Sequence, residues 1–177
     1  MVLSRGAQLR IRQPTTRLLT EFLISEFPNG GYQTNVPLGP TMDRLVQAFG
    51  EAHGTAASRP FRPKVDAIAF PPGRLVLLEA KEPVHAKGIG DLLFYRSLLP
   101  DTPELTVYAG RPVELWLVVP WATPALTVAA PRLGITLKVY RPTWYDQRMQ
   151  DINSYWTADA VDAREEKKKL RASLGVE

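Results

Sequence analysis

Two apolar segments near the middle of the chain, KVDAIAF (64–70) and RLVLLEA (74–80), most constrain the fold. Pro71-Pro72-Gly73 lies between them and is typical of a tight connection, so the segments are predicted to be neighbouring strands of a hairpin. Each strand carries an acid where a small domain would place an apolar side chain, Asp66 on the first and Glu79 on the second. A buried acid without a partner is costly, so this pattern indicates a functional site rather than a plain core.

The spacing of these acids also brings a lysine to the same place. Side chains on a strand repeat on one face every two residues, so Glu79 and Lys81 share a face, and a hairpin brings Asp66 close to Glu79. Neighbouring carboxylates repel each other unless a cation lies between them. A divalent ion that prefers oxygen ligands, Mg²⁺ with Mn²⁺ as a substitute, satisfies both acids and leaves room for water and a phosphate oxygen. With Lys81 to orient or deprotonate that water, the pattern predicts metal-assisted phosphodiester hydrolysis.

The periodicity of the remaining chain predicts an α/β domain with a mixed central sheet. Helices are expected over 15–27, 88–99 and 143–172, further strands over 32–38, 113–120 and 135–140, and a short helix or ordered loop over 41–54 and 123–134. Because Leu75 to Leu78 and the segment 113–120 are continuously apolar, both strands are expected to be buried. We expect a basic arm at 1–14, one core at 15–142, and a helical extension at 143–177 packed on the same domain.

The composition limits which metal ligands the chain can offer and indicates the cellular compartment in which it works. With 177 residues, of which 45% are hydrophobic, the chain suits one globular core. The absence of cysteine excludes disulfides and thiolate metal sites and fits a reducing, cytoplasmic location. With two histidines a His-rich zinc site is a poor fit, which leaves oxygen ligands for any metal. The net charge of +4 is compatible with nucleic acid without requiring it.

We expect neither a signal peptide nor a membrane partner. Arginines interrupt the apolar residues near the start of the sequence. The most apolar long stretch, 113–137, is interrupted by three prolines and Arg132, so it is predicted to be strand, short helix and strand in a soluble core.

Asp66, a turn, and then Glu79-Ala80-Lys81 at the end of an apolar strand resemble the PD-(D/E)XK nuclease superfamily. The resemblance covers residues 15–140. It implies a restriction-endonuclease-like αβββαβ core with a mixed central sheet flanked by helices, which is the order of elements predicted above, plus a C-terminal helix. It also implies that Asp66 and Glu79 bind the metal, that the carbonyl of Ala80 completes the metal site, and that Lys81 is catalytic.

The sequence departs from the pattern of the superfamily in places. Val65 stands where the superfamily name has proline, which is a common variation. Many members carry Gln-Leu-x-x-Tyr on the helix that follows the site; here Leu92 and Tyr95 fit, whereas Asp91 replaces the glutamine.

Members of this superfamily often add a glutamate from the first helix to the site. Helical spacing places Glu26 in the middle of the apolar face of the 15–27 helix. Glu21 lies in the half of the helix where members usually carry this residue, so the two indications disagree and the ligand stays unassigned.

The predicted function is that of a Mg²⁺-dependent nuclease that cuts DNA, with RNA the less favoured substrate. The lack of a recognisable reader module favours structure-selective or partner-directed cleavage, in restriction, transposition, a phage-encoded role, DNA repair or recombination. Whether the chain acts as a homodimer or in a larger nucleoprotein assembly stays open.

Two rival functions remain at this stage. The first keeps the fold as a catalytically silent nucleic-acid-binding or assembly subunit. The second is an unrelated α/β enzyme whose acids serve other metal chemistry. Carboxylates of Asp66 and Glu79 too far apart to share one ion would exclude the nuclease.

Several charged and aromatic residues have plainer structural explanations. Glu79 and Lys81 could form a surface ion pair worth under about 1 kcal/mol. Solvent exposure is the favoured role of His85, Lys87, Asp91, Arg96, the arm arginines Arg5, Arg10, Arg12 and Arg17, and the segment REEKKKLR, although phosphate contact is an alternative for some. The aromatic residues Trp144, Tyr145, Tyr155 and Trp156 are expected to anchor the terminal helix rather than to stack on bases.

Overall fold

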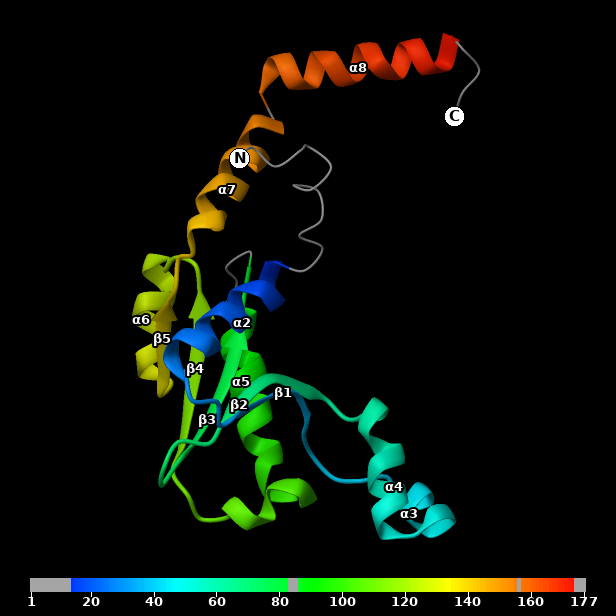
Figure 1. Ribbon diagram of the computed structural model, residues 1–177, viewed down its shortest axis with the longest axis vertical. Helices are drawn as coiled ribbons and strands as arrows, with labels where there is room; N and C mark the ends of the chain where they lie inside the picture. The colour runs from blue at the N-terminus through cyan, green and yellow to red at the C-terminus, as the bar shows by residue number, and fades with distance from the viewer. Residues whose placement is uncertain (1–13, 83–85, 156, 174–177) are drawn as a thin grey trace. The chain divides into compact units, whose positions relative to one another are not determined.

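The computed structural model describes residues 14–82, 86–155 and 157–173. The chain divides into two compact units, residues 1–140 and residues 141–177. The first unit is an α/β domain in which helices flank a mixed sheet of five strands (Figure 1), so the predicted α/β class with a mixed central sheet is confirmed.

The strands follow one another across the sheet in the order of the sequence. They are β1 Tyr32–Pro37, β2 Lys64–Ala69, β3 Leu75–Ala80, β4 Val113–Val119 and β5 Ile135–Val139. β1, β2 and β3 pair antiparallel, whereas β3, β4 and β5 pair parallel. Each parallel step requires a crossover connection, and the chain supplies a helix for each one.

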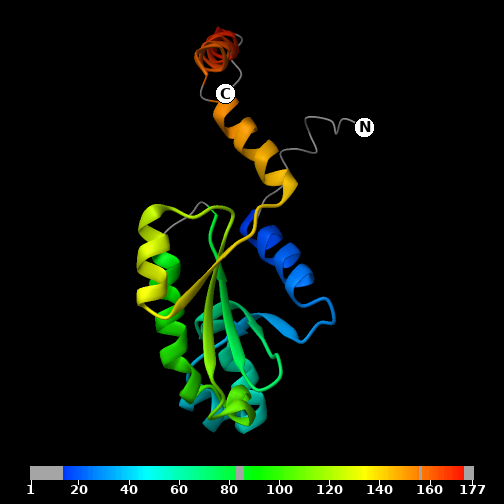
Figure 2. The ribbon, with the colours of Figure 1, turned by 90° about the vertical axis from the view of Figure 1, so that its left-hand side faces the viewer.

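Helices cover both faces of this sheet. Their bounds are α2 Pro14–Glu26, α3 Asp43–Phe49, α4 Glu51–Ser58, α5 Lys87–Leu98 and α6 Pro124–Arg132, with short 3-10 helices η1 Arg59–Phe61, η2 Leu99–Asp101 and η3 Pro103–Tyr108. Figure 2 shows α2 on one side of the sheet and the crossover helices α5 and α6 on the other. α2 buries its apolar face, where the ring of Phe22 lies 6.4 Å from that of Trp116 on β4.

The interior of the domain is built around the two central strands. β3 is buried along its whole length, and β4 is buried from Leu115 to Val119, as their apolar sequences predict. The main apolar cluster joins side chains of the sheet, such as Leu77 and Leu117, to Ile89 and Leu92 of α5. Because the end of β3 lies inside this core, the polar residue Glu79 of β3 is surrounded by packed side chains.

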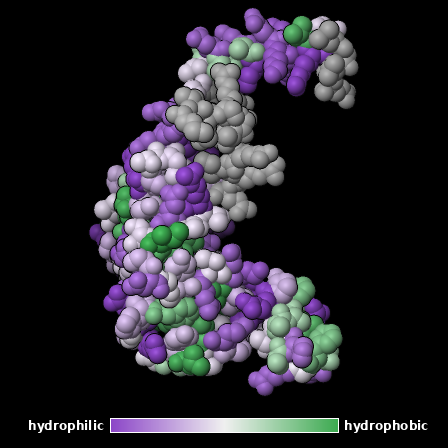
Figure 3. All heavy atoms as spheres, in the orientation of Figure 1, coloured by the Kyte–Doolittle hydropathy of each residue, from purple (hydrophilic) through white to green (hydrophobic). Residues whose placement is uncertain are grey.

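The long connection between β1 and β2 forms two helices where a short helix or an ordered loop was expected. Gly50 has φ +76° and separates α3 from α4. A Cβ at Gly54 would lie 2.4 Å from the Cα of Val46, so the two helices pack closely because residue 54 is glycine. Figure 3 shows apolar side chains gathered on α3 and α4, and Phe49 is among the exposed apolar residues.

The second unit contains α7 Thr143–Tyr155 and α8 Ala158–Ser173, where the sequence predicted continuous helix over 143–172. α8 has no buried residue and is largely hydrophilic on the face seen in Figure 3. Within the described part of the chain, no helix is both long and apolar enough to cross a membrane.

Candidate active site

Asp66 and Glu79 face each other across the β2–β3 hairpin, as the sequence predicts. The strands pair Ala67 with Leu78, and one further step in this register sets Asp66 opposite Glu79. The main-chain nitrogen of Asp66 lies 3.4 Å from Oε2 of Glu79, and the N–H of Ala80 donates a 2.9 Å hydrogen bond to Oδ2 of Asp66. Each acid is therefore bonded to the strand that carries the other.

Glu79 is a buried acid, with 5% of its side chain exposed. Burial raises its pKa to about 7, and the neighbouring carboxylate of Asp66 adds to the increase. The ammonium of Lys81, whose Nζ lies 2.6 Å from Oε1 of Glu79, offsets part of this effect. The ion pair between Glu79 and Lys81 that was the plain explanation therefore forms, but it is buried rather than on the surface.

Lys81 is held between two carboxylates. Its Nζ lies 2.6 Å from Glu79 and 2.8 Å from Oδ2 of Asp91 on α5. Burial alone would lower the pKa of Lys81, but the bonds with Asp91 and Glu79 outweigh burial and raise it above its ordinary value. In this arrangement Lys81 stays protonated at neutral pH, which favours charge stabilisation over proton abstraction.

Asp91 was expected to be an exposed helix charge, and this expectation is wrong. It is half-buried and forms an ion pair with Lys81 because α5 approaches the end of β3 closely. A Cβ at Gly88, one turn earlier on α5, would lie 2.5 Å from Cδ1 of Leu117 and 3.0 Å from Cγ of Lys81. The spacing Gly88-x-x-Asp91, which begins seven residues after Lys81, is the sequence signal that could have identified this contact.

Asp66 opens onto a small pocket of about 80 Å³. Thr16 and Thr20 of α2, together with Thr34 and Asn35 of β1, line this pocket beside the acid. Burial raises the pKa of Asp66, and the charge of Asp91 acts in the same direction, while the N–H of Ala80 and the ammonium of Lys81 act against them. The pocket is large enough for a water molecule or an ion next to the carboxylate.

Glu21 and Glu26 are not among the residues that line this pocket; the side chains of α2 that do so are threonines and Leu19. Glu21 forms an ion pair with Arg17 at 2.8 Å. Glu26, predicted to lie in the middle of the apolar face, is instead exposed, because α2 ends at this residue and its carboxylate pairs with Lys138 of β5 at 3.3 Å.

The two positions of α5 that fit the superfamily pattern differ in their surroundings. Leu92 is fully buried in the core. Tyr95 is half-buried, and its pKa is raised to about 12 by burial and by the charges of Glu79, Asp91 and Asp66. Its ring therefore lies in the negative field of the acids, and its hydroxyl stays protonated.

The residues present fit a divalent ion in part. Asp66 and Glu79 are neighbouring carboxylates with raised pKa values, and Asp66 lines a water-sized pocket; this is a donor set that such an ion neutralises. However, no group of three or more acids and histidines that could hold a metal occurs within the described ranges. A main-chain oxygen, for which Ala80 is the candidate, and water would therefore have to complete the coordination.

The other residues singled out in the sequence either lie away from the acids and Lys81 or fall outside the described residues. His85, Trp156, Arg5, Arg10 and Arg12 lie outside the described residues, as does the side chain of Tyr155. Lys87 and Arg96 are exposed on α5, as expected. Trp144 and Tyr145 form an edge-to-face pair on α7, with ring centroids 6.0 Å apart.

Comparison of the chain with protein-family models, with curated proteins and with solved structures found no match. The geometry of Asp66, Glu79, Lys81 and Asp91 is therefore what indicates a function.

Proposed function

We propose that this chain is a Mg²⁺-dependent nuclease of the PD-(D/E)XK type that hydrolyses phosphodiester bonds in DNA. The observation that carries the proposal is the pair of Asp66 and Glu79, joined across the hairpin by the contacts of 3.4 and 2.9 Å. Such a pair concentrates negative charge that a divalent ion neutralises. The adjacent ammonium of Lys81 adds a group that binds anionic oxygens.

The arrangement of the elements also supports a restriction-endonuclease-like core. The expected order of helix, three strands, helix and strand corresponds to α2, β1 to β3, α5 and β4. The acids lie on the second and third strands of this series, and the lysine follows the third.

In this proposal each residue has a distinct role. Asp66 and Glu79 hold the ion, and the carbonyl of Ala80 assists them. The bound ion supplies Lewis acidity toward a phosphate oxygen and lowers the pKa of a bound water. Lys81, kept protonated, donates to the phosphate oxygens on which negative charge develops. Asp91 positions Lys81 without contacting the substrate.

One observation favours the catalytically silent subunit as a second candidate. Lys81 already forms an ion pair with each of Glu79 and Asp91, so both acids have a cationic partner without a metal. In that case the chain would bind nucleic acid or contribute to an assembly, and the ion pairs at the end of β3 would be structural.

A cleavage assay separates the two candidates. Plasmid and single-stranded DNA are incubated with the wild-type protein, Asp66→Asn and Lys81→Met in Mg²⁺, in Mn²⁺ and in EDTA. Asparagine keeps an oxygen that can accept the hydrogen bond of Ala80, so Asp66→Asn mainly removes charge. Asp162→Asn, on exposed α8, is the matched control.

The nuclease predicts metal-dependent cleavage that is lost in Asp66→Asn and Lys81→Met and kept in Asp162→Asn. If no protein cleaves DNA but all bind it equally, the silent subunit is the better function. Cleavage that survives in EDTA would contradict both candidates.

A further inference from the structure

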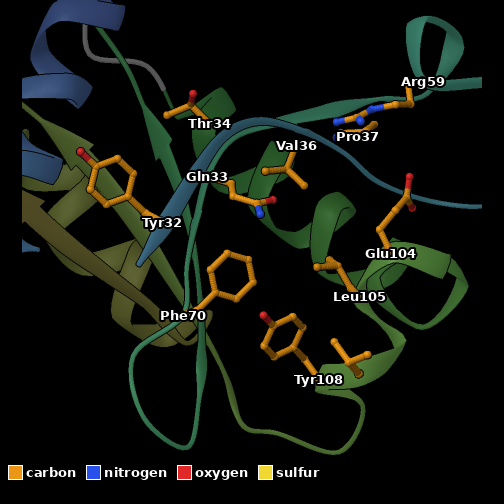
Figure 4. Close-up of a pocket in the computed structure, with 11 residues that line it drawn as sticks. Tyr32, Gln33, Thr34, Val36, Pro37, Arg59, Phe70, Glu104, Leu105 and Tyr108 are labelled. Atoms are coloured by element: carbon orange, nitrogen blue, oxygen red, sulfur yellow. The ribbon is translucent and has the colours of Figure 1, made fainter. Parts of the chain in front are cut away.

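A half-open groove of about 720 Å³ runs along the outer edge of β1, the first strand of the sheet. Its walls come from four separate parts of the sequence: β1 itself, Arg59 of η1, Phe70 directly after β2, and η3 with Tyr108. Figure 4 shows Gln33, Phe70 and Tyr108 around its centre. None of the roles assigned above involves this groove.

An aromatic surface lies in the groove. The rings of Phe70 and Tyr108 are 4.8 Å apart and tilted by 33°, and both residues are half-buried, so part of each stays accessible. Figure 4 shows the two rings side by side within the groove. The guanidinium of Arg111 lies 4.9 Å from the centre of the Tyr108 ring. Partly exposed aromatic side chains of this kind are surfaces on which nucleic-acid bases stack, with little preference for sequence.

The charge around the groove favours an anionic ligand. Glu104 is the acid among the described lining residues, and it is neutralised by the buried guanidinium of Arg62 through bonds of 2.7 and 2.9 Å. Arg59 lines the groove and is exposed, and Arg111 is exposed beside Tyr108. Once Glu104 is paired, the arginines leave this edge of the sheet positive, as phosphate binding requires.

The groove and the small pocket beside Asp66 share a lining residue. Thr34 lines both the groove and the small pocket that contains Asp66. Phe70 directly follows β2 and is four residues from Asp66, which corresponds to about 14 Å at roughly 3.4 Å per strand residue. A chain with a base on Phe70 could therefore reach Asp66 within a few nucleotides.

We propose that this groove binds an unpaired segment of DNA, with a base stacked on Phe70 and Tyr108 and a phosphate bound by Arg59. The inference rests on the proposed function and narrows its substrate to DNA with a single-stranded segment next to the cleaved bond. Stacking needs an unpaired base, because the faces of a base are covered inside a duplex.

The test measures binding apart from cleavage. A fluorescently labelled single strand of about 15 nucleotides, without self-complementarity, is titrated with the full chain in EDTA at several salt concentrations. The variants are Tyr108→Leu, which removes the stacking ring, and Arg59→Gln, an exposed change that leaves the core intact. Arg132→Gln on α6, which precedes β5 at the opposite edge of the sheet, is the matched control.

We expect Tyr108→Leu to weaken binding about 5- to 150-fold, the range for loss of one stacked base. Arg59→Gln should reduce the slope of log affinity against log salt by about 0.7, the value for one phosphate contact on a single strand. Arg132→Gln should bind as the wild type does. A blunt duplex should bind more weakly and be insensitive to Tyr108→Leu.

The proposal is overturned if Tyr108→Leu and Arg59→Gln bind the single strand as the wild type does. It is also overturned if the duplex, or an RNA strand of the same sequence, binds as tightly with the same dependence on both residues. If the wild type cleaves DNA but its binding does not depend on Tyr108 and Arg59, the proposed role of the groove is wrong and the proposed nuclease function stands. If binding depends on both residues as expected but no DNA is cleaved, the proposed role of the groove stands and the proposed nuclease function is wrong.

Discussion

The ammonium of Lys81 lies 2.8 Å from Oδ2 of Asp91, so a residue of the crossover helix α5 holds the lysine that follows β3. Lys81 is thereby fixed from two sides, by Glu79 of its own strand and by the helix. The position of the positive charge depends on the packing of α5 as well as on the hairpin.

Replacing Asp91 by asparagine tests this dependence. Asp91→Asn removes one charge-assisted contact of Lys81, worth about 1.5–3 kcal/mol, so we expect the cleavage rate to fall about tenfold or more. The comparison is with Asp101→Asn, an exposed acid of η2, in a single-turnover assay. An unchanged cleavage rate in Asp91→Asn would show that Lys81 does not need the contact with α5 to be positioned for cleavage.

Glu79→Gln should change how stability depends on pH. In the wild type the pKa of Glu79 is raised from 4.5 to about 7, so its contribution to stability is complete below about pH 4.5 and is lost as pH rises through about 7. Glutamine does not titrate. The free energy of unfolding of Glu79→Gln, relative to the wild type, should therefore increase by about 3 kcal/mol between these limits.

Urea unfolding in EDTA at about pH 5 and about pH 8 measures this difference. A difference between the two proteins that stays constant with pH would contradict the raised pKa. Adding Mg²⁺ at the higher pH should stabilise the wild type more than Glu79→Gln, since an ion that binds the folded state stabilises it.

Two glycines of α5 provide a matched pair of variants. A Cβ at Gly88 would lie 2.5 Å from Leu117 and 3.0 Å from Lys81, whereas a Cβ at Gly90 would meet nothing within 4 Å. We expect Gly88→Ala to cost about 1–3 kcal/mol through overpacking and to slow cleavage by displacing Lys81. Gly90→Ala should be neutral or stabilise by up to about 1 kcal/mol, because alanine is the better helix former. Thermal unfolding of both variants checks this; equal stabilities would mean that α5 does not approach β3 this closely.

Glu104→Gln should destabilise the connection around the groove. The side chain of Arg62 is 3% exposed and depends on Glu104 for charge balance, while its other bonds reach the carbonyls of Pro37 and Leu38. Removing one partner of a buried ion pair costs about 3–5 kcal/mol, and we expect about 3 because Glu104 is 36% exposed. The midpoint of urea unfolding measures the loss, with Glu51→Gln, at an exposed acid of α4, as the control. A midpoint equal to that of the control would mean that Arg62 is stable without its partner.

The acid pair could be predicted from the sequence because strand geometry is periodic. A short connection between two apolar strands brings Asp66 near Glu79, and the alternation of side chains brings Lys81 near Glu79. The α/β class and the mixed sheet follow from similarly local patterns. The break between α3 and α4 was missed because it depends on the φ of a single residue, Gly50.

Contacts that depend on how separate elements pack could not be predicted in the same way. Asp91 resembles any helix charge until Gly88 allows α5 to approach Lys81. Glu26 shares the spacing of the buried face, but the helix ends at Glu26, and so its side chain lies in solvent near Lys138. The groove combines residues of β1 and η3 with Arg59 and Phe70, and no local pattern links these segments.

In the proposed function, Asp66 and Glu79 support metal-dependent cleavage of DNA. The most direct measurement is the single-turnover rate of cleavage of a labelled DNA with a single-stranded segment in Mg²⁺, for the wild type, Asp66→Asn and Asp162→Asn. The account predicts that Asp66→Asn loses about 100-fold or more in rate while Asp162→Asn matches the wild type. Equal rates for Asp66→Asn and the wild type, or no cleavage by any of the three proteins, would contradict it.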